Sequence, residues 1–140
     1  MLNKIKLINI FQKLLDEAKN SYDEFNSADG KIGDGDLGVT ILHGLEEVNN
    51  NISKFNDDMG ANFMICSQAF VKKSGSSFGT LIAFSFMNIS KHLNGKTECN
   101  LIDIRDSNEL QKTGKIENSL NVSRGLLEFA LNPEGEYIKS

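Results

Sequence analysis

The sequence predicts a mainly α-helical protein, with an antiparallel helix bundle in residues 1–94 and a small α/β strand-helix-strand segment in residues 95–140. Apolar residues recur every three or four positions through most of the first part, which is the period of an amphipathic helix. Beyond residue 95 the pattern changes to a short apolar run that is typical of a buried strand. The length of 140 residues suits one domain or two very small ones.

Four helices are expected in the first part. They span about residues 4–25, 36–52, 61–72 and 78–93, and the fourth is very apolar. Glycine, serine, asparagine and aspartate are concentrated in the intervening segments, as expected of turns. Because alternate connections of an antiparallel bundle lie at the same end, we expect the first and third loops to be neighbours.

The second part is expected to contain a strand at residues 100–104 and a helix at residues 108–113 that Ser107 caps. A second strand is expected at residues 119–122 and a short helix at residues 125–131. The boundary between the two parts is placed at residues 94 and 95, where the helical pattern ends.

Composition excludes several classes of function. Fifteen basic against nineteen acidic residues give a net charge of −4, which argues against broad binding of nucleic acid. No apolar run reaches the ~20 residues of a membrane span, and the N-terminus lacks the pattern of a signal peptide, so a cytoplasmic chain is expected. Cys66 and Cys99 form no Cys-x-x-Cys motif, which favours reduced thiols over a structural zinc site.

Three aspartates make the segment 28–38 the most informative part of the sequence. Asp29, Asp34 and Asp36 alternate with four glycines, which let the backbone curl so that the carboxylates can converge. Such hard oxygen ligands suit Mg²⁺ or Ca²⁺, and the helix that follows offers N–H groups to a phosphate. The pattern excludes an EF-hand that starts at Asp36, because Ile41 stands where that loop needs glycine. A solvated turn without metal remains the alternative.

The connection at residues 73–80 is rich in glycine and serine and precedes the fourth helix. Small residues let backbone amides approach an anion, and hydroxyl groups can donate to it. The spacing differs from that of a Walker A loop. A helix-helix turn with serine capping is the alternative reading.

The first part resembles the DhaL domain, the nucleotide-binding domain of dihydroxyacetone kinases. Asp29-Gly30-Lys31-Ile32-Gly33-Asp34-Gly35-Asp36-Leu37-Gly38 is similar to one family motif, and the run from Gly75 to Thr80 is similar to another. The resemblance implies Mg²⁺, bound ADP or ATP, and no catalytic residue in this chain. The implied magnesium ligands are Asp29, Asp34 and Asp36, and the implied nucleotide contacts are Thr40, Gly75, Ser76, Ser77 and Gly79.

The match departs from the family at three positions and in its extent. Leu37 stands where family members often have His or Thr, Thr40 stands where they often have Asn, and Phe78 stands where a small glycine is usual. Only residues 3–93 are covered, which corresponds to half of the family's eight-helix barrel. The resemblance therefore implies an oligomer or a barrel completed by a partner. It also implies that a substrate-binding kinase subunit is needed for phosphoryl transfer to a small ketone or polyol.

The second part is similar to the start of a rhodanese domain. Leu101 to Asp106 resembles its first strand and Asp-x-Arg turn, and residues 109–129 continue the likeness. No cysteine stands at the catalytic position, and we expect Asp103 and Arg105 to pair structurally. The alternative functions are therefore a rhodanese-like sulfur-handling or interaction module, or an inactive fusion remnant.

Overall fold

The computed structural model describes residues 1–117 and 119–132. Contacts divide the chain into two compact units, one formed by Asn3–Cys99 and the other by residues from Asn100 onward together with Met1 and Leu2. The fold is mainly α-helical with small two-stranded sheets, as the sequence predicts. None of the helices in the described ranges combines the length and apolar character that a bilayer crossing needs.

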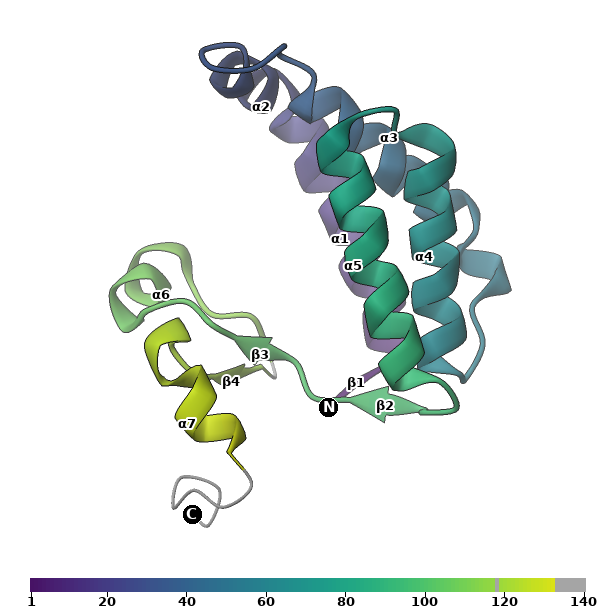
Figure 1. Cartoon of the computed structure of the whole chain (residues 1–140), viewed down its shortest axis with the longest axis vertical. Coiled ribbons are helices and arrows are strands. Elements are labelled where there is room, and N and C mark those ends of the chain that lie inside the picture. Colours follow the sequence, from purple (N-terminus) through teal and green to yellow (C-terminus); the bar gives the residue numbers. More distant parts are fainter. Residues whose placement is uncertain (118, 133–140) are drawn as a thin grey trace. The chain divides into compact units, whose positions relative to one another are not determined.

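Five α-helices build the unit Asn3–Cys99 (Figure 1). The helices are α1 (Lys4–Asn20), α2 (Tyr22–Asp29), α3 (Leu37–Asn50), α4 (Met59–Lys73) and α5 (Ser77–Leu93), and a 3₁₀ turn spans Ile52–Lys54. Strand β1 (Leu2–Asn3) pairs with β2 (Glu98–Cys99) in a two-stranded sheet. The α2–α3 and α4–α5 connections lie at the same end of the unit (Figure 1).

The expected single helix over residues 4–25 is wrong: the structure has two helices separated at Ser21. Ser21 leaves the helical region with φ −99° and ψ 8°, and its N–H still donates to the Glu17 carbonyl at 2.9 Å. The apolar period continues across this break because α1 and α2 both pack against α3. The second helix runs as far as Asp29, so this aspartate ends a helix instead of lying in a free loop.

The core of this unit is built around α3, which contacts α1, α2, α4 and α5. Phe86 of α5 lies among the rings of Phe11, Phe63 and Phe70, with centroids 5.9, 5.9 and 5.7 Å away. Gly44 lets α3 approach α4, because a Cβ there would stand 2.3 Å from the Phe70 ring. Aromatic packing and this close approach together hold α1, α3, α4 and α5 in one core.

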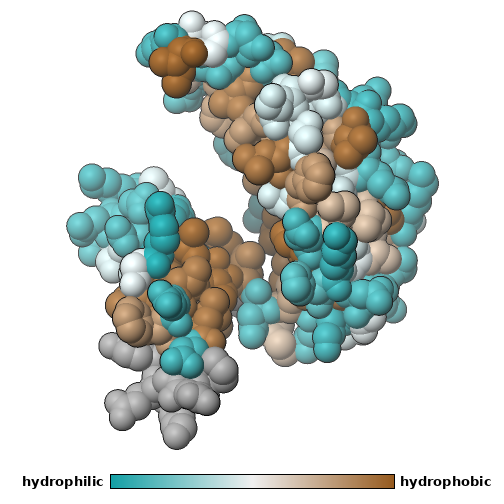
Figure 2. Space-filling view, viewed as in Figure 1, coloured by the Kyte–Doolittle hydropathy of each residue, from teal (hydrophilic) through white to brown (hydrophobic). Residues whose placement is uncertain are grey.

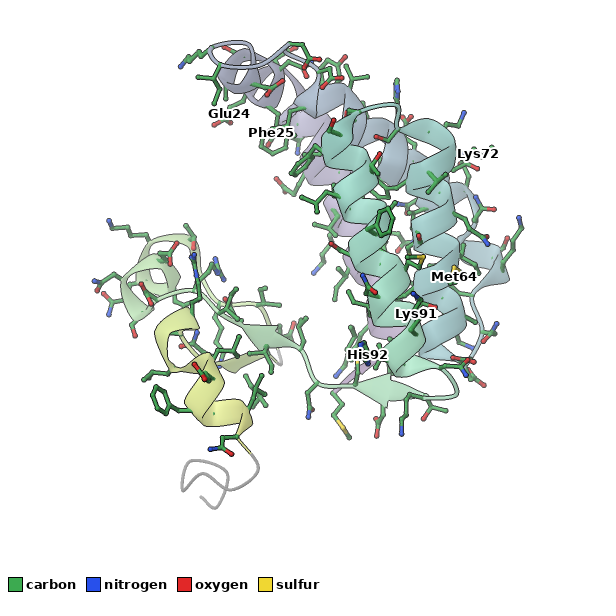
Figure 3. All side chains as sticks on the ribbon, viewed as in Figure 1. Glu24, Phe25, Met64, Lys72, Lys91 and His92 are labelled. Carbon is green, nitrogen blue, oxygen red and sulfur yellow. The ribbon has the colours of Figure 1, made fainter. Side chains whose placement is uncertain are left out.

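An ion pair between a buried glutamate and an exposed lysine joins α3 to α4. The Lys72 ammonium, near the end of α4 in Figure 3, donates to Glu47 Oε1 at 2.6 Å. The Asn51 amide donates to the same oxygen at 3.2 Å. The hydrogen bond from Lys72 is the main reason why the pKa of Glu47 lies below its ordinary value.

The second unit contains the predicted strand-helix-strand order. Its elements are β3 (Ile102–Asp103), α6 (Ser107–Thr113), β4 (Leu120–Asn121), a 3₁₀ turn (Arg124–Leu126) and α7 (Leu127–Leu131). Strands β3 and β4 are parallel, with Ile102 opposite Leu120. The expected cap at Ser107 is wrong, because Asp106 is the N-cap and forms a capping box with Glu109.

Candidate functional site

The three aspartates converge in space. Asp29 ends α2, Asp34 lies in the connecting loop, and Asp36 immediately precedes α3. One carboxylate oxygen from each lies within 4.8 Å of the other two. We call residues 29–38 the acid loop.

Backbone hydrogen bonds hold Asp29 at the centre of the acid loop. Its Oδ2 accepts from the N–H groups of Gly35 at 2.9 Å and Asp36 at 3.1 Å. Gly35 has φ +78°, a conformation that glycine adopts without strain. Gly33 is equally constrained, because a Cβ there would lie 2.6 Å from Asp29 Oδ1. The glycines therefore let the loop wrap around one carboxylate, as the sequence suggests.

The electrostatics of the acid loop are unfavourable without a cation. The pKa of Asp36 is raised from its ordinary value, first by partial burial and then by the negative charges of Asp34 and Asp29. None of the ion pairs within the described residues involves these three carboxylates. A bound cation would relieve this repulsion and lower the pKa of Asp36.

The donor set fits a hard divalent cation. Mg²⁺ binds oxygen at about 2.0–2.1 Å in octahedral geometry, so its ligands lie about 2.9 Å apart when adjacent and about 4.2 Å apart when opposite. The oxygens of Asp29, Asp34 and Asp36 lie within 4.8 Å of one another, so the loop would contract to bring all three onto one ion. The remaining ligand positions would be open to water or phosphate oxygens.

The second loop, residues 74–79, is called the serine loop and begins α5. Ser76 is the N-cap of α5, and its Oγ accepts from the Gly79 N–H at 3.1 Å. The same oxygen accepts from the Thr40 hydroxyl at 2.8 Å and lies 3.3 Å from Ser74 Oγ. The N–H groups of Ser77 and Phe78, in the first turn, have no acceptor within the helix and can bind an anion.

The acid loop and the serine loop line one open cavity of about 500 Å³. The lining residues are Asp29, Asp34, Asp36, Leu37, Gly75, Ser76, Ser77 and Phe78. Carboxylates that could hold a cation therefore face hydroxyl and N–H groups that could hold phosphate. The prediction that Asp34 and Ser77 share one end of the bundle is confirmed.

Two of the expected nucleotide-binding residues lie behind this lining. Thr40 is buried, with 4% of its surface exposed, and its hydroxyl is used by Ser76. The Gly79 N–H is also used by Ser76, and a Cβ at Gly79 would collide with Ser74. Both residues thus hold Ser76 in place, while Gly75, Ser76 and Ser77 face the cavity.

The expected free N–H groups at the start of α3 are largely occupied. Asn26 of α2 accepts from Gly38 N–H at 2.7 Å and from Val39 N–H at 3.3 Å. Sequence reasoning missed Asn26, because a capping side chain that lies twelve residues before the N–H group it binds follows no local spacing rule. A phosphate would therefore meet free helix N–H groups at α5, not at α3.

The second unit contains a structural ion pair at the Asp-x-Arg turn, as expected. Arg105 donates from Nε to Asp103 Oδ1 at 2.9 Å and from Nη2 to Oδ2 at 2.7 Å. These hydrogen bonds lower the pKa of Asp103 to about 2. Arg105 also donates to the Thr113 hydroxyl and the Gly114 carbonyl, so its guanidinium is engaged within the turn.

Neither thiol is activated. Cys66 is fully buried in α4, and burial raises its pKa. Burial is also the main reason why the pKa of Cys99 is raised. Both thiols therefore remain protonated near pH 7, where a nucleophile needs the thiolate.

Comparison with family models identifies the family of this chain. The family model of the DAK2 domain matches residues 31–122, which is more than half of the sequence. The chain therefore belongs to the DAK2 domain family, and it is a dihydroxyacetone kinase-family module. This supports the DhaL resemblance, and the match includes Asp34, Asp36 and the serine loop. No curated protein and no solved structure matched the chain. None of these comparisons supports the rhodanese likeness.

Replacing Ser76 with alanine should lower the free energy of unfolding by about 2 kcal/mol, because the α5 cap is lost and the buried Thr40 hydroxyl loses its acceptor. Ser77→Ala is the matched control, since the Ser77 side chain has no hydrogen bond among the contacts of the described residues. That variant should stay within about 0.5 kcal/mol of wild type. Urea unfolding measures both changes, and equal stability of the two variants would contradict this account of Ser76.

Proposed function

We propose that the helical unit binds a magnesium-nucleotide complex, with ADP or ATP as the nucleotide, between the acid loop and the serine loop. Asp29, Asp34 and Asp36 hold the cation, while Ser76 and Ser77 bind phosphate oxygens together with the backbone of the serine loop. A bound magnesium ion neutralises charge on the phosphate groups. Thr40 and Gly79 contribute by fixing the hydroxyl of Ser76.

The observation that carries this proposal is the shared cavity. Carboxylates with no cationic partner line one side, and a capped helix N-terminus with serine hydroxyls lines the other. A cation alone would explain the first side and an anion alone the second. A cation bound to a phosphate group matches both sides at once.

The proposed reaction is phosphoryl transfer to a small ketone or polyol, carried out with a partner. The cavity offers groups for a metal and for phosphate, but its three carboxylates are assigned to the cation and its lining contains no histidine or lysine to act on an acceptor hydroxyl. A substrate-binding kinase subunit would hold the acceptor and complete the reaction. This chain then acts as the nucleotide-binding module.

The outer face of α5 favours association. Apolar side chains are exposed on its first half (Figure 2), and Phe78, Leu81 and Phe84 are 45, 62 and 56% exposed. We propose that a second copy, or a chain that supplies further helices, covers this face. Basic residues gather at the other end of the helix, where Lys91 and His92 lie in its last turn (Figure 3).

A rhodanese-like sulfur-handling or interaction role for the second unit is the alternative proposal. The parallel pair β3–β4 and the Asp103–Arg105 turn are the features that favour it. The protonated state of both thiols argues against sulfur transfer. A third alternative is an inactive fusion remnant, which requires that the chain neither binds a magnesium-nucleotide complex nor transfers sulfur.

Asp34→Asn should weaken binding of magnesium-ADP at least tenfold, or ~1.4 kcal/mol, because it removes one full charge from the metal ligands. The same change should slightly stabilise the metal-free protein, since it relieves repulsion with Asp36. Calorimetric titration and thermal unfolding measure these two opposite effects.

Asp16→Asn is the matched control for Asp34→Asn. Asp16 is an exposed aspartate on α1, outside the cavity lining. Its substitution removes the same charge far from the proposed metal ligands. The affinity for magnesium-ADP and the free energy of unfolding should therefore stay at wild-type values. If Asp34→Asn and Asp16→Asn bind magnesium-ADP equally well, the acid loop is only a turn.

The exposed α5 face predicts that the purified chain associates at high concentration. Sedimentation velocity should detect a dimer or larger species, and Leu81→Lys should shift it toward the monomer by placing charge in the apolar face. Lys91→Gln, a change at the polar end of α5, should leave association unaltered. A compact monomer at every concentration would count against self-association and leave a second chain as the partner.

Thiosulfate and cyanide should yield no thiocyanate above the uncatalysed rate, because both thiols have a raised pKa. Cys66→Ser and Cys99→Ser should behave as wild type in this assay. Thiocyanate formation that one of these substitutions abolishes would establish the rhodanese-like alternative. If the chain neither forms thiocyanate nor binds magnesium-ADP, the inactive fusion remnant is the remaining alternative.

A further inference from the structure

We propose that Asn26 is the positioning residue of the acid loop. It caps α3 in place of Asp36, which frees the Asp36 carboxylate for the metal, and it holds α2 so that Asp29 reaches the same point. The contribution of Asn26 to metal binding rests on the function proposed above. The positioning itself acts on the protein alone and can be tested without a ligand.

The side chain that caps α3 comes from another helix, α2. Aspartate is among the residues preferred at the N-cap, where its side chain accepts from the first turn. Asp36 stands at this position, yet its side chain makes no capping hydrogen bond. The N–H groups of Gly38 and Val39 are instead bound by Asn26 Oδ1 at 2.7 and 3.3 Å. The Asp36 carboxylate is thereby left to join Asp29 and Asp34.

Asn26 also fixes the end of α2. Its carbonyl accepts from the Gly30 N–H at 2.9 Å, which closes the helix turn that contains Asp29. Its side chain ties the same turn to α3. One residue therefore links the helix that carries Asp29 directly to the helix that Asp36 precedes.

Helix α2 is packed less tightly than the other helices of this unit. None of its eight residues is buried, so packing contributes less to its position than it does for α1 or α4. Its backbone lies close to α3, where a Cβ at Gly38 would stand 2.4 Å from the Tyr22 carbonyl oxygen. Glycine permits this approach, and the Asn26 side chain supplies the directed contacts that maintain it.

Hydrogen exchange of the Gly35 and Asp36 amides reports the positioning directly, because both N–H groups donate to Asp29 Oδ2. In metal-free protein, Asn26→Ala should accelerate exchange of both amides about tenfold, the scale of a lost cap. Asn26→Asp keeps the acceptor but adds a negative charge beside the acid loop, so both amides should exchange more slowly than in Asn26→Ala. Asn3→Ala is the matched control, because Asn3 caps α1 through the Lys6 N–H at 3.1 Å. It should destabilise the protein without changing these two amides.

Calorimetric titration of magnesium-ADP on the same variants gives the second readout. At least a tenfold loss of affinity in Asn26→Ala, with wild-type affinity in Asn3→Ala, supports the proposal. If wild type binds no magnesium-ADP while Asn26→Ala still accelerates exchange, the proposed function fails and the positioning role stands. Unchanged exchange in Asn26→Ala, or equal acceleration in Asn3→Ala, overturns it. If Asn26→Ala does not fold, Asn26→Gln, which displaces the amide by one methylene, must show the accelerated exchange.

Discussion

The candidate site depends on the hydrogen bond between the hydroxyl groups of Thr40 and Ser76. This contact, 2.8 Å long, joins the first turn of α3 to the N-cap of α5 beneath the cavity. Thr40 is buried, so water competes little for its hydroxyl. Helix α3 also packs against α1, α2 and α4, and Asn26 ties it to the end of α2. The positions of the acid loop and the serine loop are therefore both set relative to one helix.

Two different arrangements surround the carboxyl groups whose pKa is shifted. Glu47 and Asp103 each have a cationic partner, Lys72 or Arg105, and hydrogen bonds from that partner lower the pKa of each. Asp36 has two acidic neighbours instead, and its pKa is raised. The first arrangement stabilises the fold by itself. The second is unfavourable for the protein alone and becomes favourable with a cation, which is the arrangement typical of a binding site.

Local patterns in the sequence predicted most of the fold and the position of the site. Apolar periodicity located α3, α4 and α5, and the glycine-aspartate segment located the acid loop. The break at Ser21 could not be predicted, because the apolar stripe continues through it. Asn26 was also missed, and Thr40 was assigned to the nucleotide although it lies behind Ser76. The roles of Asn26 and Thr40 both depend on how α2, α3 and α5 pack. Tertiary contacts of this kind produce no recognisable spacing of residues in the sequence.

The most direct test of the central claim is whether one bound ligand touches both loops. Mn²⁺-ADP broadens the amide signals of nearby nuclei in an NMR spectrum, and the backbone amides of residues 34–38 and 75–78 are the probes. The account predicts that signals from both loops broaden together at substoichiometric Mn²⁺-ADP, while that of Gly95, beyond the far end of α5, persists. Broadening of the acid loop alone, or uniform weak broadening across the chain, would contradict a shared magnesium-nucleotide site.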